Sequence, residues 1–279
     1  MDFDVTLPSG RIRARRWGAP DAPLLLCVPG LSANLSAFSA IGEQVASGVR
    51  QVVAIDLRGT GRSEITPAGS YGLATHARDV VGIADALGVA RFDLAGWSLG
   101  ALVAMQVALC DGPRLRTVTL IDHAGPTDAA ALVPVRDGLA RLDLVVADPQ
   151  TYLDAVRSAG HAPPWSPFWD AYHRYELTQR ADGTWSPSTS RAAAEEDLRQ
   201  RWPRDWSPWW EALTMPTTLI RALQPEGGAL VVPPRAVVSM REVTPDVVVV
   251  ETPASDHYTC LEDPVTAVAI TAQLSAGED

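Results

Sequence analysis

The sequence predicts an α/β protein with a mostly parallel, twisted sheet, helices on both faces and a helical insertion. Short apolar runs alternate with longer segments of helical spacing, which is the pattern of strand–helix–strand units. This alternation stops near residue 125 and resumes near residue 214, so the chain is predicted to leave the sheet and return to it. We therefore expect a core formed by residues 1–124 and 214–279, and a Trp-rich helical cap formed by residues 125–213.

Composition narrows the function classes. The chain has 279 residues, of which 47% are hydrophobic, so it can bury a large core. Its net charge of −10 argues against nucleic acid as a partner, because such partners need a basic face. No apolar run approaches the roughly 18 residues that span a membrane, and the first residues lack the pattern of a secretory signal. We expect a cytoplasmic protein that acts on a small molecule, and the oligomeric state stays open.

Cysteine usage supports the same compartment. Cys27, Cys110 and Cys260 are far apart in the sequence and lie in apolar surroundings, so we expect reduced core residues. Their spacing fits neither a disulfide framework nor a zinc site. No other metal or cofactor motif is found in the sequence, so we expect no metal and no cofactor.

The first third of the chain supplies half of the predicted sheet. Alternating residues around Pro8-Ser9-Gly10 predict a hairpin, and two fully apolar runs predict buried strands. The strands expected here are 3–7, 11–17, 22–28 and 51–55. The helices expected here are 33–47 and 73–87. Right-handed crossovers place the carboxyl ends of the parallel strands on one edge, where the catalytic groups of α/β proteins gather.

A strand, a sharp turn and a helix follow at residues 92–110. The turn reads Gly96-Trp97-Ser98-Leu99-Gly100, a Gly-x-Ser-x-Gly pattern. In such a turn the serine has a strained backbone and its hydroxyl is exposed, while the glycines let strand and helix approach closely. We therefore expect Ser98 to be a nucleophile.

A serine nucleophile needs a base, and the base needs an orienting acid. His257 follows the last predicted strand, 247–251, and so lies on the same sheet edge as Ser98; His123 competes with it. Asp122 ends the strand 115–121, where side-chain geometry is well controlled, and is the favoured acid. Glu226, in a Gly-rich loop after the strand 217–223, is the alternative acid.

Acyl transfer also needs donors for the oxyanion. The N–H of Leu99 opens the helix after Ser98, where helix N–H groups lack partners. Gly30 permits a turn that directs the Leu31 N–H toward the same point. We expect Leu31 and Leu99 to form the oxyanion hole.

The predicted cap holds seven of the nine tryptophans. Helical spacing predicts helices at 129–147, 149–159, 166–180 and 190–201, and many aromatic rings in one insertion predict an aromatic-lined pocket. We expect Trp165, Trp169 and Trp206 of the cap, together with Trp97, to bind substrate. After the cap the pattern of the core resumes. Helices are expected there at 234–242 and 263–274.

Four stretches together resemble one known family. They are Val28-Pro29-Gly30-Leu31-Ser32, Asp56-Leu57-Arg58-Gly59-Thr60-Gly61-Arg62-Ser63, the Ser98 turn, and Asp256-His257-Tyr258. The chain resembles α/β-hydrolases of the abhydrolase-1 type from end to end, which implies the α/β-hydrolase fold with its triad of serine, histidine and acid. Two departures stand out: Pro29 occupies the place of a usual histidine, and residues 221–228 lack the common Gly-x-x-Asp. The second departure favours Asp122 as the acid.

The function expected from the sequence is hydrolysis of a carboxylic ester or lactone through an acyl-enzyme, without a cofactor, on a small hydrophobic or aromatic substrate. A serine in the turn argues against dehalogenase or epoxide-hydrolase chemistry, which in this family relies on an aspartate there. Relatives with a Pro-Gly loop and an aromatic cap imply an alternative, in which His257 is the base for cofactor-free oxygenation or C–C bond cleavage of an aromatic substrate. A non-catalytic binding role is disfavoured by the intact Ser98 and His257.

Overall fold

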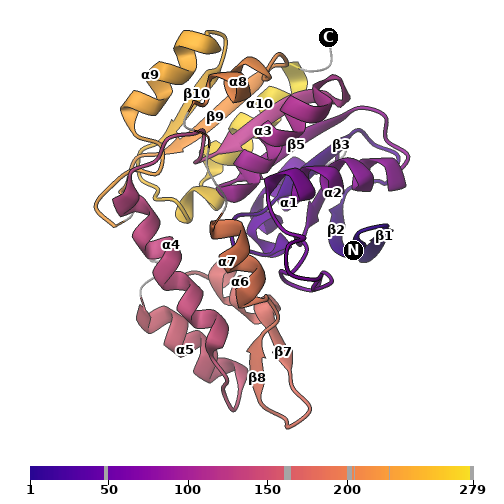
Figure 1. Ribbon diagram of the computed structural model, residues 1–279, viewed down its shortest axis with the longest axis vertical. Coiled ribbons are helices and arrows are strands. Elements are labelled where there is room, and N and C mark those ends of the chain that lie inside the picture. Colours follow the sequence, from indigo (N-terminus) through magenta and orange to yellow (C-terminus); the bar gives the residue numbers. More distant parts are fainter. Residues whose placement is uncertain (47–49, 160–164, 200–202, 204, 226, 277–279) are drawn as a thin grey trace.

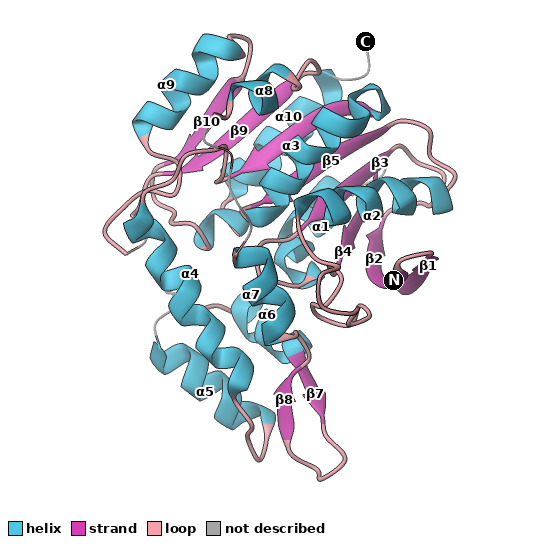
Figure 2. Cartoon of the chain, viewed as in Figure 1, coloured by secondary structure: helices cyan, strands magenta, loops and turns pink. Residues whose placement is uncertain are grey.

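An eight-stranded sheet carries the fold (Figures 1 and 2). The computed structural model describes residues 1–46, 50–159, 165–199, 203, 205–225 and 227–276. Across the sheet the strands are β1 (Asp2–Leu7), β2 (Gly10–Trp17), β4 (Gln51–Ile55), β3 (Leu24–Val28), β5 (Phe92–Trp97), β6 (Leu115–Ile121), β9 (Thr217–Ala222) and β10 (Val248–Thr252). The pairs β1–β2 and β2–β4 are antiparallel, and the other neighbouring pairs are parallel. The predicted mostly parallel sheet is confirmed.

Helices cover both faces of this sheet (Figure 1). One face carries α2 (Leu73–Ala86), α3 (Leu99–Asp111), α8 (Ser207–Glu211) and α9 (Pro234–Val243). The other face carries α1 (Ser39–Val45), preceded by the 3-10 turn η1 (Leu35–Phe38), and α10 (Pro264–Ala276). Strands β3, β4 and β5 are buried along their whole length because apolar helix faces pack on both sides. This arrangement confirms the predicted α/β-hydrolase fold.

The elements from residue 129 to residue 198, between β6 and β9, form an insertion that Figure 1 shows in the lower half of the view. Its elements are η3 (Ala129–Leu132), α4 (Val133–Gly138), η4 (Leu139–Asp143), α5 (Pro149–Ala159), α6 (Pro167–Glu176), β7 (Leu177–Gln179), β8 (Trp185–Pro187) and α7 (Arg191–Leu198). The helix expected over 129–147 is divided into short turns, and Pro134 stands in the first turn of α4. A proline fits the first turn of a helix but not its interior, so a new helix begins there.

A hairpin replaces the end of another expected helix. The helix expected over 166–180 ends at Glu176, and the chain continues into β7, which pairs antiparallel with β8. Asp182-Gly183 lies in the turn, and Gly183 has a φ of +85°. An Asp-Gly dipeptide between short strands favours a tight hairpin, so this signal was present in the sequence.

Two further expectations need correction. Helix α8 falls within residues 125–213 but packs on the core, where Trp206 and Trp210 share one apolar cluster with α3 and α9. Cys27 and Cys260 are buried, whereas Cys110 is exposed at the end of α3. In the part of the chain that the structure describes, no helix is long and apolar enough to cross a membrane.

Candidate active site

Ser98 stands on the turn between β5 and α3 with a strained backbone. Its φ is +55° and its ψ is −117°, a region that residues with side chains rarely adopt. The flanking glycines make this turn sterically feasible. A Cβ on Gly96 would lie 2.0 Å from the Gly100 carbonyl oxygen, and one on Gly100 would lie 2.0 Å from the Val28 carbonyl oxygen.

Substituting Gly100→Ala is expected to lower the free energy of unfolding by about 3 kcal/mol, because the new methyl group overlaps backbone atoms that have no room to move. Chemical denaturation followed by tryptophan fluorescence measures the loss. Gly112→Ala is the matched control, since the nearest atom to its added methyl group is 3.8 Å away. Equal stability of the two variants would contradict the prediction.

His257 lies between β10 and α10 and connects two of the other predicted residues. Its Nε2 is 2.9 Å from Ser98 Oγ, and its Nδ1 is 2.8 Å from Asp122 Oδ2. A carboxylate only accepts hydrogen bonds, so Nδ1 carries the proton and Nε2 accepts the hydrogen bond from the Ser98 hydroxyl. The residue is only 2% exposed. The structure thus brings Ser98, His257 and Asp122 into one chain of hydrogen bonds.

Strand β9 holds the Asp122 carboxylate in place. The Asp122 N–H donates to the Ile220 carbonyl at 2.8 Å, and Asp122 Oδ1 accepts from the Ala222 N–H at 2.9 Å. Asp122 has a φ of +47°, so the chain turns sharply as it leaves β6. The alternative acid, Glu226, lies outside the described residues.

The loop after β3 lies against the Ser98 turn. A Cβ on Gly30 would lie 3.1 Å from Ser98 Cβ, and Leu31 and Leu99 line the same cavity as Ser98. Leu99 opens α3, where the first N–H groups have no acceptor within the helix. The next loop residue, Ser32, has a φ of +54°, and Arg141 of the insertion donates to its carbonyl oxygen at 2.8 Å. The insertion therefore supports the loop that carries Leu31.

The cavity at Ser98 has apolar walls with a few polar groups. Core and insertion both contribute to these walls, the insertion through Ala131, Leu132, Val135, Asp197 and Leu198. Asp197 contacts His76 of α2, with both carboxylate oxygens 3.0 Å from Nε2. The predicted rival base, His123, also lines the cavity, but the nitrogen that accepts a hydrogen bond from the Ser98 hydroxyl belongs to His257.

Burial and the neighbouring His257 lower the pKa of His123 to about 4. The His123 ring is therefore neutral near pH 7 and adds no positive charge beside His257. No group of three or more His, Cys, Asp or Glu side chains within the described ranges is arranged to hold a metal ion.

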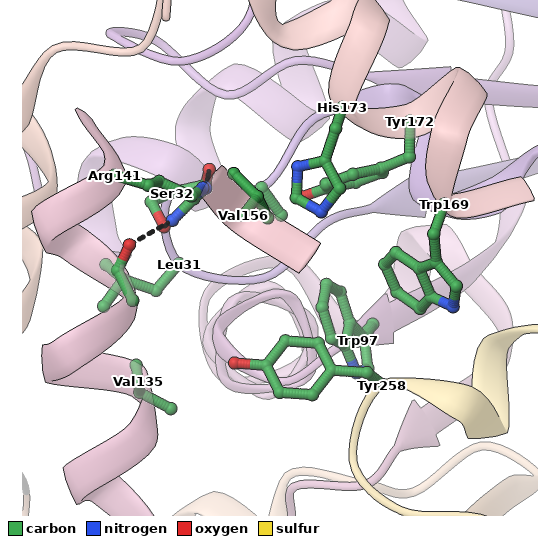
Figure 3. A pocket seen from close by; sticks show the side chains of 12 residues that line it. Leu31, Ser32, Trp97, Val135, Arg141, Val156, Trp169, Tyr172, His173 and Tyr258 are labelled. Atoms are coloured by element: carbon green, nitrogen blue, oxygen red, sulfur yellow. Dashed lines mark hydrogen bonds between the residues drawn. The ribbon is translucent and has the colours of Figure 1, made fainter. Parts of the chain in front are cut away.

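The four tryptophans expected to bind substrate have different places. Trp97 and Trp169 line a second cavity next to the first (Figure 3), and Trp97 Nε1 donates to the His257 carbonyl at 2.9 Å. Trp165 stacks on His173 with 5.4 Å between ring centroids. The expectation for Trp206 needs correction: among the described residues it lines neither of these two cavities, and it packs in the core against Gly125 and Trp209.

Sequence reasoning missed a buried polar network in the insertion. Glu176 Oε1 accepts from Arg141 Nη2 at 2.7 Å, and Glu176 Oε2 accepts from the Tyr152 hydroxyl at 2.8 Å and lies 3.1 Å from His173 Nδ1. His173 and Glu176 are three positions apart on the buried face of α6, beside Trp169 and Tyr172. The sequence did contain a signal for this network, because two ionisable residues lie on a helix face that is otherwise aromatic.

This network makes stability depend on pH. Burial disfavours the Glu176 carboxylate, but Arg141 and His173 outweigh it and hold the pKa at about 2, below the ordinary 4.5. A carboxyl group with a lowered pKa stabilises the folded protein above pH 4.5, and this stability is lost as the pH falls toward 2. The difference between the two pKa values, 4.5 and about 2, corresponds to about 3 kcal/mol of unfolding free energy. Glu176→Gln is expected to remove most of this pH dependence and to cost about 3–5 kcal/mol at pH 7, because Arg141 stays buried without its partner.

Urea unfolding at a series of pH values between 7 and 3 measures both effects. Glu195→Gln is the control, because Glu195 is exposed on α7 and pairs with Arg191 on the surface. The prediction fails if Glu176→Gln and Glu195→Gln unfold with the same pH dependence.

Comparisons with known proteins agree with this fold. A family model described as alpha/beta hydrolase fold matches residues 23–264. A putative carbamate hydrolase, RutD, of Variovorax paradoxus is 34% identical over 139 residues, which are 50% of this chain and only 51% of that protein. N-formylmaleamate deformylase of Pseudomonas putida is 27% identical over 257 residues, covering 89% of this chain and 86% of that enzyme. Among solved structures, E-2-(acetamidomethylene)succinate hydrolase superposes with a TM-score of 0.86 at 24% identity, over 99% of both chains.

Proposed function

Because the chain belongs to the α/β-hydrolase fold family, we propose that it is a serine hydrolase that cleaves an acyl bond of a small substrate through an acyl-enzyme. The bond is a carboxylic ester or lactone, or an N-acyl bond of the amide type. The observation that carries the proposal is the continuous hydrogen-bond chain from Asp122 through His257 to Ser98. A serine activated in this way is suited to attack on a carbonyl carbon.

In the proposed reaction Ser98 Oγ attacks the carbonyl carbon while His257 Nε2 takes the hydroxyl proton. Asp122 stabilises the imidazolium that forms and holds it in position. The bond to the leaving group then breaks, and His257 returns the proton to the departing oxygen or nitrogen. A water molecule next gives its proton to His257 and attacks the acyl-enzyme, which releases the acid and restores Ser98.

The negative charge on the carbonyl oxygen needs donors that are already in position. We assign this role to the N–H groups of Leu99, at the start of α3, and of Leu31. Arg141 would act indirectly here, because its hydrogen bond to the Ser32 carbonyl supports the residue next to Leu31.

The substrate class rests on the cavity walls and on the relatives. Apolar walls with few polar groups favour a small, hydrophobic acyl compound. The relatives include a putative carbamate hydrolase and a deformylase, which is why N-acyl bonds join esters in the proposal. We propose that η3 to α7 act as a cap, since Leu132, Val135 and Leu198 line the same cavity as Ser98.

Cofactor-free oxygenation or C–C cleavage with His257 as a direct base is the second candidate, favoured by the aromatic rings near the site. The first proposal accounts better for the engagement of His257 Nε2 with Ser98, because a base that acts on the substrate alone does not need that partner.

The test combines labelling with substrate assays. A fluorophosphonate probe should label the folded protein at Ser98, and matched pairs of short acyl esters and N-acyl compounds should show which bond is cleaved. An oxygen electrode follows the same reactions with aromatic substrates. Absence of labelling together with oxygen consumption would reject the acyl-enzyme and favour the second candidate.

A further inference from the structure

A second cavity adjoins the one at Ser98, and we call it the aromatic chamber (Figure 3). Its ring walls are Trp97, Trp169, Tyr172, His173 and Tyr258. Leu31 and Val135 line both cavities, so the two spaces are neighbours. Trp97 and Tyr258 are also the sequence neighbours of Ser98 and His257. A molecule bound at Ser98 therefore has the aromatic chamber directly beside it.

His173 is held in one orientation in the wall of this chamber. Its ring stacks on Trp165 with an interplanar angle of 13° and meets the edge of Tyr172 at 4.8 Å between centroids. Its Nδ1 lies 3.1 Å from Glu176 Oε2. Figure 3 shows the ring projecting from α6 with its other nitrogen, Nε2, directed toward the middle of the chamber.

Glu176 determines which nitrogen of His173 carries the proton. The ion pair with Arg141 keeps the Glu176 carboxylate charged, so it only accepts hydrogen bonds. His173 Nδ1 must therefore donate, and burial lowers the pKa of His173, so the ring is neutral. Its Nε2 then offers a lone pair to the chamber, as a fixed hydrogen-bond acceptor.

Arg141 is a cation in the chamber wall, but its donors are already used. Its Nε and Nη2 donate to Glu176, Nη2 also donates to the Ser32 carbonyl, and Nη1 donates to the Gly138 carbonyl and to Ser32 Oγ. These bonds account for all five N–H groups of a guanidinium. The sequence contains no lysine. Among the residues that the structure describes, the chamber therefore presents an acceptor and aromatic faces, without a cation that is available to an anion.

We propose that the aromatic chamber binds an uncharged planar part of the substrate, aromatic or conjugated, and that His173 Nε2 accepts a hydrogen bond from an N–H or O–H group of that part. The proposal rests on the proposed function only in treating the bound molecule as a substrate of Ser98. Flat ring walls favour a planar group by stacking and edge contacts. A buried acceptor disfavours an analogue that lacks the donor, because His173 Nε2 would then lose water without gaining a partner.

Indole and benzofuran make a matched pair of probes, since they have nearly the same shape and only indole has an N–H. Isothermal titration calorimetry with the unaltered protein is expected to show about fivefold tighter binding of indole, the effect of one neutral hydrogen bond. Benzoate, a planar anion, is expected to bind more weakly than indole. Equal affinity for indole and benzofuran, or tighter binding of benzoate, would overturn the proposal.

Substitutions of His173 test whether this side chain causes the preference for indole over benzofuran. His173→Phe keeps an aromatic ring but removes both nitrogens, so this variant should bind indole and benzofuran with about equal affinity. Tyr152→Phe is the matched control: it also removes one partner of Glu176 but leaves His173 Nε2 unchanged, so the preference should remain. His173→Gln, which can again present an acceptor, should restore part of the preference. Retention of the full preference in His173→Phe would show that indole binds elsewhere and would overturn the proposal.

These binding measurements do not depend on turnover. If the indole preference follows His173 but the fluorophosphonate leaves Ser98 unlabelled, the chamber proposal stands and the acyl-enzyme proposal fails. If Ser98 is labelled and the indole preference is absent, the acyl-enzyme proposal stands and the chamber proposal fails.

Discussion

Replacing Ser98 by alanine is expected to lower kcat for acyl hydrolysis by about 10⁴-fold or more, while the protein remains folded. The hydroxyl is the atom that attacks in the proposed reaction, and the histidine and acid behind it act only through it. Substrate binding and the oxyanion donors are unchanged in this variant. We therefore also expect a small residual activity, above the rate of the uncatalysed reaction in water. Steady-state kinetics on a short acyl ester, with the melting temperature measured in parallel, give both quantities.

The control for Ser98→Ala is Ser275→Ala, an exposed serine on α10 that is distant in sequence from the site. Its kcat should equal that of the unaltered protein. Full hydrolysis by Ser98→Ala would reject the acyl-enzyme, and turnover of an aromatic substrate by Ser98→Ala but not by His257→Ala would favour His257 as a direct base.

The substitution Asp122→Asn is expected to reduce kcat by about 10⁴-fold. An amide can turn its NH₂ group toward His257 Nδ1, which then becomes an acceptor, so the ring proton moves to Nε2. The Nε2 atom, 2.9 Å from Ser98 Oγ, then has no lone pair to take the hydroxyl proton. Because Asn keeps the shape of Asp, stability should change much less than activity, and kinetics together with thermal unfolding separate the two.

Two comparisons make the test of Asp122 decisive. Asp128→Asn alters an exposed carboxylate that pairs with Arg235, and its activity should be unchanged. Glu226→Gln alters the other acid that the sequence suggested, and it should also stay active. A large loss in Glu226→Gln with a loss below tenfold in Asp122→Asn would move the acid role to Glu226.

The Ser98 turn was predictable because its determinants are local. A buried strand, two glycines and a helix within residues 92–110 specify the turn, and steric exclusion at Gly96 and Gly100 explains why the pattern needs them. His257 was predictable from topology, since parallel strands place their carboxyl ends on one edge. The sequence favoured Asp122 over Glu226 as the acid, but it could not show the backbone hydrogen bond from β9 that holds the Asp122 carboxylate against the imidazole.

The insertion was predicted least well. Trp206 was expected to bind substrate but packs on the core. The sequence does not separate these two cases, because an aromatic residue in a pocket and one in a core have the same spacing. His173 was overlooked, although it projects into the aromatic chamber. Its contacts with Glu176 on the same helix and with Trp165 form only when α6 folds against the rest of the insertion.

Periodicity and short-range sterics were enough to predict the α/β-hydrolase fold, the position of Ser98 and the edge of the sheet at which His257 lies. The folded structure was needed to show the hydrogen bond between Asp122 and His257, the tryptophans that line a cavity, and the pairing of Arg141 with Glu176. These features depend on side chains from distant segments meeting at hydrogen-bond distance. Such meetings are fixed by the packing of whole elements, which no local pattern in the chain encodes.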